Sequence, residues 1–178
     1  MSGPEVTGVS RGRTITEADV VQFAALTGDM HPQHVDAAWA AGSRFGERVA
    51  HGMLVLSYCV GLVEFDPQRV VALRRVSNAV FKRPVALGDT IHVESEVEAA
   101  APLGDGHSLV SCVWRVMNGE GQLVARATVE LVWRDRPAGD DATADLGTGS
   151  PMPASVAGGR GTPPPPAALD DGFVPIPL

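Results

Sequence analysis

The strongest constraint on the fold is a short stretch, residues 52–63, in which almost every side chain is apolar and none is charged. A helix of this length that is hydrophobic on all sides is typical of a protein core. It is also too short for a membrane span, which needs about 20 apolar residues. The sequence therefore predicts a helix buried at the centre of a domain.

The residues after this helix show the two-residue period of half-buried β-strands. In the segment 91–98, Ile91 and Val93 share one face, whereas His92 and Glu94 share the other. Strands are predicted at residues 70–81, 91–98, 109–117 and 123–134. Because four strands follow one another without intervening helices, we expect an antiparallel sheet wrapped around the buried helix, an α+β arrangement.

Two further helices are predicted on the N-terminal side of the buried one. Thr16 and Asp19 form a capping-box pattern and Gly28 is a typical stop, so a helix is expected over residues 17–27. The alanine-rich residues 36–42 favour a second, shorter helix.

The composition changes after Arg134. The last 44 residues contain nine of the 14 prolines, and their charged side chains contribute −4 to the net charge of −7. A segment with so few large apolar side chains cannot form its own core. We therefore expect a domain at residues 1–134 and an extended or disordered tail at 135–178.

Two parts of this tail differ from the rest. Four consecutive prolines at 163–166 favour an extended polyproline helix, which suits a spacer or a ligand for an aromatic groove. The final residues, 173–178, are apolar again. One hypothesis is that they dock onto the domain or onto a partner.

The net charge and the number of cysteines argue against several classes of protein. A net charge of −7 and a pI near 5.1 are the opposite of what a nucleic-acid or anionic-membrane binder requires. Cys59 and Cys112 are too few for a disulfide scaffold and lie in apolar runs, so buried free thiols are expected. The first residues do not have the pattern of a secretion signal, so we expect a cytoplasmic protein.

Residues that can carry chemistry are concentrated between the first two predicted helices. Asp29 and His34 are five positions apart, and Pro32 fixes the chain between them. A tight loop can therefore bring a carboxylate and an imidazole into one small volume. An Asp and a His in a polar loop are, however, more often turn or capping groups. The spacing alone leaves both interpretations open.

The whole segment resembles a known family. Residues 29–36 are similar to the motif Asp-x-Asn-Pro-x-His-x-Asp of the MaoC-like, R-specific enoyl-thioester hydratases and dehydratases, and 51–53 match its His-Gly-Met. Residues 81–89 match the family pattern Phe-x-x-Pro-Val-x-x-Gly-Asp. The resemblance covers roughly residues 11–134, and several motifs in order are a much stronger signal than one.

This resemblance implies a hot-dog fold, in which an antiparallel sheet wraps a long helix and two such units pair in a homodimer. It also implies that Asp29 and His34 hold the water that adds to a trans-2-enoyl thioester, or that leaves a 3-hydroxyacyl thioester. The acyl group is expected on coenzyme A or acyl carrier protein. Neither a metal nor a redox cofactor is expected.

Elementary chemistry agrees with these roles. Adding water at the β-carbon needs a base for the water and an acid for the α-carbon, while the thioester oxygen gains negative charge. An amide at the start of a helix can receive that charge, because its N–H has no partner within the helix. Gly52, at the start of the buried helix, is the candidate donor; close packing at a helix start is the alternative explanation for this glycine.

Several neighbouring residues are candidates for supporting roles. His31 replaces the family's Asn, and we favour a structural hydrogen bond over a direct chemical role. Asp36 is expected to cap a helix, and His51 to pack beside the helix start. Four basic residues are candidates for binding the phosphates of the thioester carrier, or else are solvated strand ends: Arg74, Arg75, Lys82 and Arg83.

Other functions remain compatible with the sequence. A tailoring enzyme of polyketide biosynthesis could use the same pair for dehydration or a double-bond shift. A noncatalytic hot-dog binding subunit is a second alternative, although the presence of both Asp29 and His34 counts against it. A metal site built from Asp29, His31 and His34 is disfavoured because the pattern offers no convincing fourth ligand.

Overall fold

The computed structural model describes residues 6–137 of the 178-residue chain. Its helices are α1 (Glu17–Thr27), α2 (Pro32–Val35), α3 (Ala37–Ala41) and α4 (Gly52–Leu62). Its strands are β1 (Gly8–Val9), β2 (Arg13–Thr14), β3 (Val70–Phe81), β4 (Thr90–Gly104), β5 (His107–Asn118) and β6 (Leu123–Arg134). The expected tail, with its polyproline run and apolar end, lies almost entirely outside the described residues.

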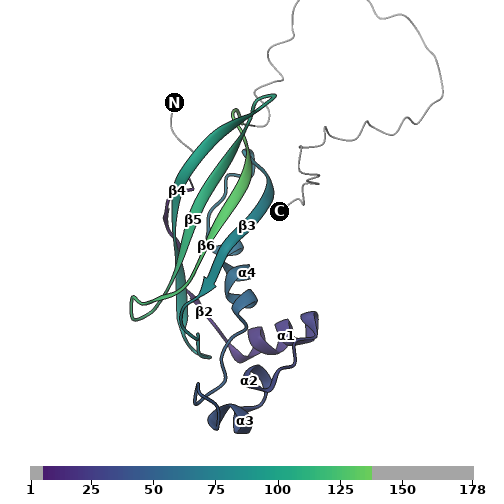
Figure 1. Ribbon diagram of the computed structural model, residues 1–178, viewed down its shortest axis with the longest axis vertical. Helices are drawn as coiled ribbons and strands as arrows, with labels where there is room; N and C mark the ends of the chain where they lie inside the picture. Colours follow the sequence, from purple (N-terminus) through teal and green to yellow (C-terminus); the bar gives the residue numbers. More distant parts are fainter. Residues whose placement is uncertain (1–5, 138–178) are drawn as a thin grey trace, which may run out of the picture.

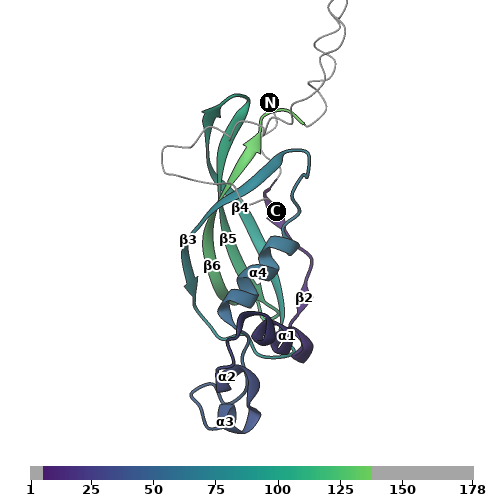
Figure 2. The same ribbon diagram turned by 90° about the vertical axis from the view of Figure 1, so that its right-hand side faces the viewer.

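The strands form one antiparallel sheet in the order β1-β4-β5-β6-β3, and β2 also pairs with β4. Helix α4 lies along one face of this sheet, and α1, α2 and α3 gather at one end of it (Figures 1 and 2). The predicted antiparallel sheet around a central helix is confirmed. Strand β3 is left at one edge, with no neighbour on its outer side among the described residues.

The core lies between α4 and the sheet. Leu54, Val55 and Cys59 of α4 are buried, and Trp114 and Leu131 of the sheet are buried with them. Burying a large apolar side chain contributes about 1.5–3 kcal/mol. This packing fixes α4 and therefore fixes the position of its first residue, Gly52. Burial also raises the pKa of Cys59 to about 12, so this thiol is inert.

Helix α1 begins and ends as the sequence predicts. The side chain of Thr16 accepts from the amide of Asp19, the Asp19 carboxylate accepts from the amide of Thr16, and Gly28 closes the helix in the left-handed conformation with φ of 80°. Glycine adopts this conformation without the steric cost that a Cβ atom adds. The chain therefore turns sharply, and Asp29 is the first residue beyond the turn.

Asp19 also connects three elements of the fold. Its carboxylate is 2.8 Å from the guanidinium of Arg13 in β2, and Arg13 donates to the hydroxyl of Tyr58 in α4. Burial raises the pKa of Asp19, but hydrogen bonds from Tyr58 and Thr16 and the charge of Arg13 together lower it to about 2. The ionised carboxylate thus stabilises the folded state.

Replacing Asp19 with Asn should lower the free energy of unfolding at neutral pH by about 2 kcal/mol. It should also make this free energy depend less on pH in the acid range. Because folding lowers the pKa of Asp19, the contribution of its carboxylate to the free energy of unfolding is complete above about pH 4 and is lost as the pH falls through about 2. Urea unfolding of both proteins between pH 7 and pH 3 measures this difference. Equal slopes of stability against pH would contradict the assignment. An Asp105→Asn variant, changed in an exposed turn, is the control.

The structure also contains elements that were not predicted. Strands β1 and β2 have two residues each, which is too short to show an alternating pattern. Helix α2 has only four residues. Strand β4 continues to Gly104, beyond the predicted end at residue 98, because its second half pairs with β5 although its side chains no longer alternate. Within residues 6–137, the helices are all too short or too polar to cross a membrane.

Candidate active site

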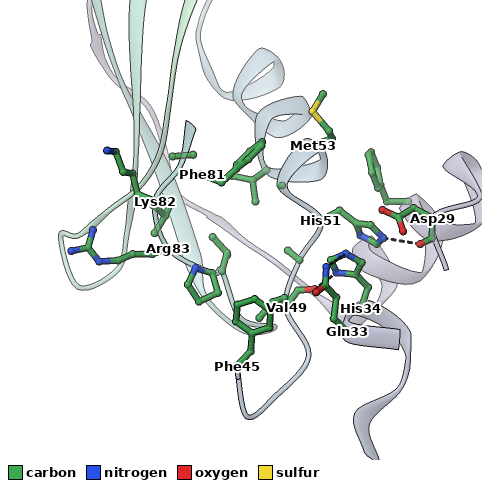
Figure 3. Close-up of a pocket in the computed structure, with 18 of the residues that line it drawn as sticks. Asp29, Gln33, His34, Phe45, Val49, His51, Met53, Phe81, Lys82 and Arg83 are labelled. Carbon is green, nitrogen blue, oxygen red and sulfur yellow. Dashed lines mark hydrogen bonds between the residues drawn. The ribbon is translucent and has the colours of Figure 1, made fainter. Parts of the chain in front are cut away.

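A cavity of about 550 Å³ opens beside the first turn of α4 (Figure 3). One wall comes from α1 and α2, which contribute Phe23, Gln33 and His34. The other wall comes from the end of β3 and the residues after it, including Phe81. Polar groups that can react are therefore placed at one end of a largely apolar pocket, the usual form of a small-molecule site.

His34 lies in α2 and is only 4% exposed. Its Nδ1 is 2.7 Å from the backbone carbonyl of Val49. A carbonyl only accepts, so Nδ1 carries the proton, and the lone pair of neutral His34 is on Nε2. The backbone carbonyl thus selects the tautomer in which Nε2 carries the lone pair and can accept a proton.

Asp29 follows Gly28 and is exposed to the cavity. A carboxylate oxygen of Asp29 lies within 4.8 Å of a ring nitrogen of His34. Two hydrogen bonds of about 2.8 Å each can span that separation through one water oxygen. The predicted convergence of Asp29 and His34 is therefore present in the structure.

His51 connects the two members of this pair. Its Nε2 is 3.0 Å from the backbone carbonyl of Asp29, to which it donates (Figure 3). Its ring stacks on that of His34 with centroids 3.7 Å apart, while Phe23 packs 5.1 Å away. His51 is 2% exposed. It thus supports both Asp29 and His34, as expected for a packed histidine beside the helix start.

The neutral form of His34 is favoured near neutral pH. Burial lowers the pKa of His34, although the hydrogen bond to the carbonyl of Val49 opposes this. The charge of His51 lowers the pKa further, and that of Asp29 raises it. A lowered pKa leaves Nε2 free of a proton, which is the state that a base requires.

Gly52 is the first residue of α4, and Phe81 packs directly against it. A Cβ atom added to Gly52 would lie 2.9 Å from the Phe81 ring. The structure therefore contains the close packing that was the alternative explanation for a glycine at this position. Its amide also lies in the first turn, where an N–H has no partner within the helix, and Gly52 lines the cavity. Both interpretations of Gly52 are thus compatible with the structure.

His31 and Asp36 hold the ends of α2. The Nδ1 of His31 accepts from the amide of Gln33, and the amide of His31 donates to Asp29 at 3.3 Å. Asp36 accepts from the amide of Trp39 and caps α3. These contacts support the structural role that we favoured for His31, and the capping expected of Asp36 is present.

The four basic residues separate into two pairs. Arg74 and Arg75 form ion pairs with Glu130 on the neighbouring strand and do not line the cavity. Lys82 and Arg83 do line it, at the wall opposite His34 (Figure 3). Only the second pair is placed to meet a molecule that enters this cavity.

Asp29, His34 and His51 also place three possible metal ligands within 4.8 Å of one another. The two imidazole rings are stacked at 3.7 Å with only 25° between their planes. Their lone pairs therefore lie in two nearly parallel planes, and a metal ion about 2.1 Å from both nitrogens would be far out of the plane of at least one ring. The donor geometry fits a metal poorly.

The cavity also contains residues that the sequence analysis did not predict for the site, among them Gln33, Arg44, Phe45 and Val49. Val49 acts through its carbonyl, which no side-chain pattern reveals. Gln33 occupies a variable position of the motif and contacts His34 directly, with its Nε2 3.0 Å from Nε2 of His34.

Fold and site together define a class of protein: an antiparallel sheet around one helix, with a carboxylate, an imidazole and a helix-start amide in one pocket. Comparisons with known proteins identify that class. A family model for the MaoC like domain matches residues 5–110. The chain belongs to the MaoC-like dehydratase family, and this membership confirms the hot-dog fold and places it among the hydro-lyases.

The similar proteins include two that are named as hydratases. The (R)-specific enoyl-CoA hydratase of Aeromonas caviae is 38% identical over 64% of this chain and 84% of its own length. The R-hydratase of Pseudomonas aeruginosa, solved in the unliganded form, is 31% identical with a TM-score of 0.62, covering 86% of this chain and 93% of its own.

One relative is much longer. Protein MaoC of Klebsiella aerogenes is 48% identical over 46% of this chain, but the match covers only 24% of that protein.

Proposed function

We propose that the protein adds water across the 2,3 double bond of a trans-2-enoyl thioester and removes it from a 3-hydroxyacyl thioester. The observation that carries the proposal is the convergence of Asp29 and His34, within 4.8 Å, in a cavity that also contains the first amide of α4. The names of similar hydratases support the same reaction.

A balanced sequence of steps fits these groups. One water is held between the Asp29 carboxylate and Nε2 of His34. As its oxygen bonds to C3 of the acyl chain, Nε2 takes one of its protons and the thioester oxygen gains negative charge. The amide of Gly52 donates to that oxygen. Nε2 then gives its proton to C2, so the product gains OH at C3 and H at C2.

The carrier of the acyl group is proposed to enter past Lys82 and Arg83. These cations line the wall opposite His34, and Arg44 lines the same cavity. Phosphate groups of coenzyme A, or of the phosphopantetheine arm of a carrier protein, suit such a cluster. The two carriers share this chemistry, so the choice between them is made by the assay.

The test is a mass-spectrometric assay on short enoyl and 3-hydroxyacyl thioesters, each on coenzyme A and on acyl carrier protein. A gain of 18 Da on enoyl substrates and a loss of 18 Da on hydroxyacyl substrates are expected. Turnover on one carrier alone identifies the partner. No turnover on any of them would reject the enzymatic proposal and favour a binding subunit.

We further propose that two copies pair through β3. This 12-residue strand is one edge of the described sheet, and Val76 and Val80 on it are 46% and 36% exposed. A long edge strand with exposed apolar side chains is normally covered. Light scattering should show a dimer, and Val76→Lys with Val80→Lys should yield monomers. A Val9→Lys variant on β1 should remain dimeric, and a monomeric wild type would contradict the pairing.

A further inference from the structure

The catalytic nitrogen of His34 is already occupied by a side chain of this protein. Because Nδ1 of His34 donates to Val49, the lone pair of the neutral ring is on Nε2. The amide nitrogen of Gln33 lies 3.0 Å from Nε2, and because an amide nitrogen can only donate, Gln33 donates to Nε2. Gln33 thus occupies the place where the proposed reaction puts a water molecule or a hydroxyl group.

Gln33 is also free to change its partner. It is only partly buried and lines the cavity beside Asp29 and His34. In an empty cavity, water can replace the donor on Nε2, so releasing Gln33 costs little. In a cavity filled by an acyl chain, no water can take the place of Gln33 as the hydrogen-bond donor to the reacting oxygen.

We propose that Gln33 is a third residue that contacts the reacting oxygen. Its amide donates to Nε2 of His34 when the cavity is empty and to the oxygen on C3 when a 3-hydroxyacyl thioester is bound. The inference rests on the proposed function, because it concerns the oxygen that the reaction adds or removes. It assigns a specificity to the site: the hydroxyacyl form is bound more tightly than the enoyl form.

This contact predicts different kinetic effects in the two directions. For the 3-hydroxyacyl substrate, the contact is present in both the ground state and the transition state, so its loss should raise KM and leave kcat unchanged. For the enoyl substrate, Gln33 still donates to Nε2 of His34 in the ground state, and the attacking water displaces it only on the way to the transition state. The contact with the oxygen on C3 is therefore gained after binding, so its loss should lower kcat and leave KM unchanged. The equilibrium constant requires kcat/KM to fall by the same factor in both directions.

The test uses Gln33→Met, which keeps the length of the side chain and removes its amide. We expect kcat/KM to fall about 3- to 10-fold in both directions, the effect of one hydrogen bond, with the split between KM and kcat described above. Gln22→Met, the same change at an exposed position of α1 outside the cavity, should behave like the wild type. Circular dichroism verifies that both variants are folded.

A second variant, Gln33→Glu, tests whether Gln33 acts through its hydrogen bond to Nε2 of His34 or only through packing. A carboxylate cannot donate to neutral Nε2 but pairs with the protonated ring, so the acid limb of kcat/KM against pH should move to higher pH. The other titratable groups facing His34 are Asp29, His31 and His51, which stay unchanged.

Three results would overturn the inference while leaving the proposed function intact. The first is a wild type that turns over thioesters and a Gln33→Met variant with wild-type constants. The second is a faster Gln33→Met variant, which would mean that Gln33 only blocks His34. The third is a fall in kcat in both directions without a change in KM, which would indicate a purely structural role. Absence of turnover in the wild type would instead reject the proposed function, and the inference with it.

Discussion

Replacing Asp29 with Asn or His34 with Ala should each lower kcat/KM by at least about 1,000-fold while leaving the fold intact. Asn keeps the shape of Asp29 but removes the charge that holds the water and stabilises protonated His34. Ala removes the base itself. General acid–base groups contribute typically 10²–10⁴-fold, and both variants also lose the position of the water.

The structure indicates how each change affects stability. Asp29 is exposed and its backbone carbonyl, not its carboxylate, accepts from His51, so Asp29→Asn keeps that contact. His34 is buried and stacked on His51, so His34→Ala leaves a small cavity and is the less stable of the two. Its melting temperature must therefore be measured beside its rate.

Matched controls separate chemistry from general damage. Asp105→Asn changes an exposed turn between β4 and β5, and His92→Ala changes a histidine on β4 that does not line the cavity. Both should keep wild-type kcat/KM. Activity retained by either Asp29→Asn or His34→Ala would reject the assignment of the pair, even if the wild type hydrates enoyl thioesters.

The fold was predictable where a local rule and the tertiary structure agree. The capping box of Thr16 and Asp19 and the stop at Gly28 are local signals, and α1 has the predicted bounds. The alternation of residues 123–134 is as clear, and β6 has those bounds. The extension of β4 was not predictable, because residues 99–104 are paired by the register with β5 and not by their own pattern.

The site was predictable in its residues but not in its contacts. Asp29 and His34 lie in one motif, so their convergence follows from a short loop. The stack between His34 and His51 joins residues 17 positions apart and depends on how α4 docks on the sheet. The role of Val49 depends on a backbone carbonyl, and the ion pairs of Arg74 depend on the pairing of β3 with β6. Such contacts require the assembled fold.

The role of Gly52 gives the second large prediction. If its amide donates to the thioester oxygen, then removing only that N–H should lower kcat by about 100- to 1,000-fold. Proline is the residue that removes an amide proton, and the first position of a helix is where it is best tolerated. His51, the residue before it, has φ of −60° and ψ of 135°, which is the extended conformation that a following proline requires.

The side chain of proline would also press on Phe81, so the comparison needs a second variant. Gly52→Ala introduces the same Cβ atom, 2.9 Å from the Phe81 ring, but keeps the N–H. Phe81 is 48% exposed and can turn aside, so both variants should fold. The ratio of kcat between Gly52→Ala and Gly52→Pro measures the contribution of the amide alone.

A large loss in Gly52→Pro with a modest loss in Gly52→Ala would assign the oxyanion to this amide. Equal losses in both would mean that Gly52 serves only the close packing of Phe81 against α4. In that case the negative charge must be received elsewhere, and the Asp29 and His34 pair would have to act without the helix start. The two variants therefore decide whether the buried helix takes part in the reaction or only carries the fold.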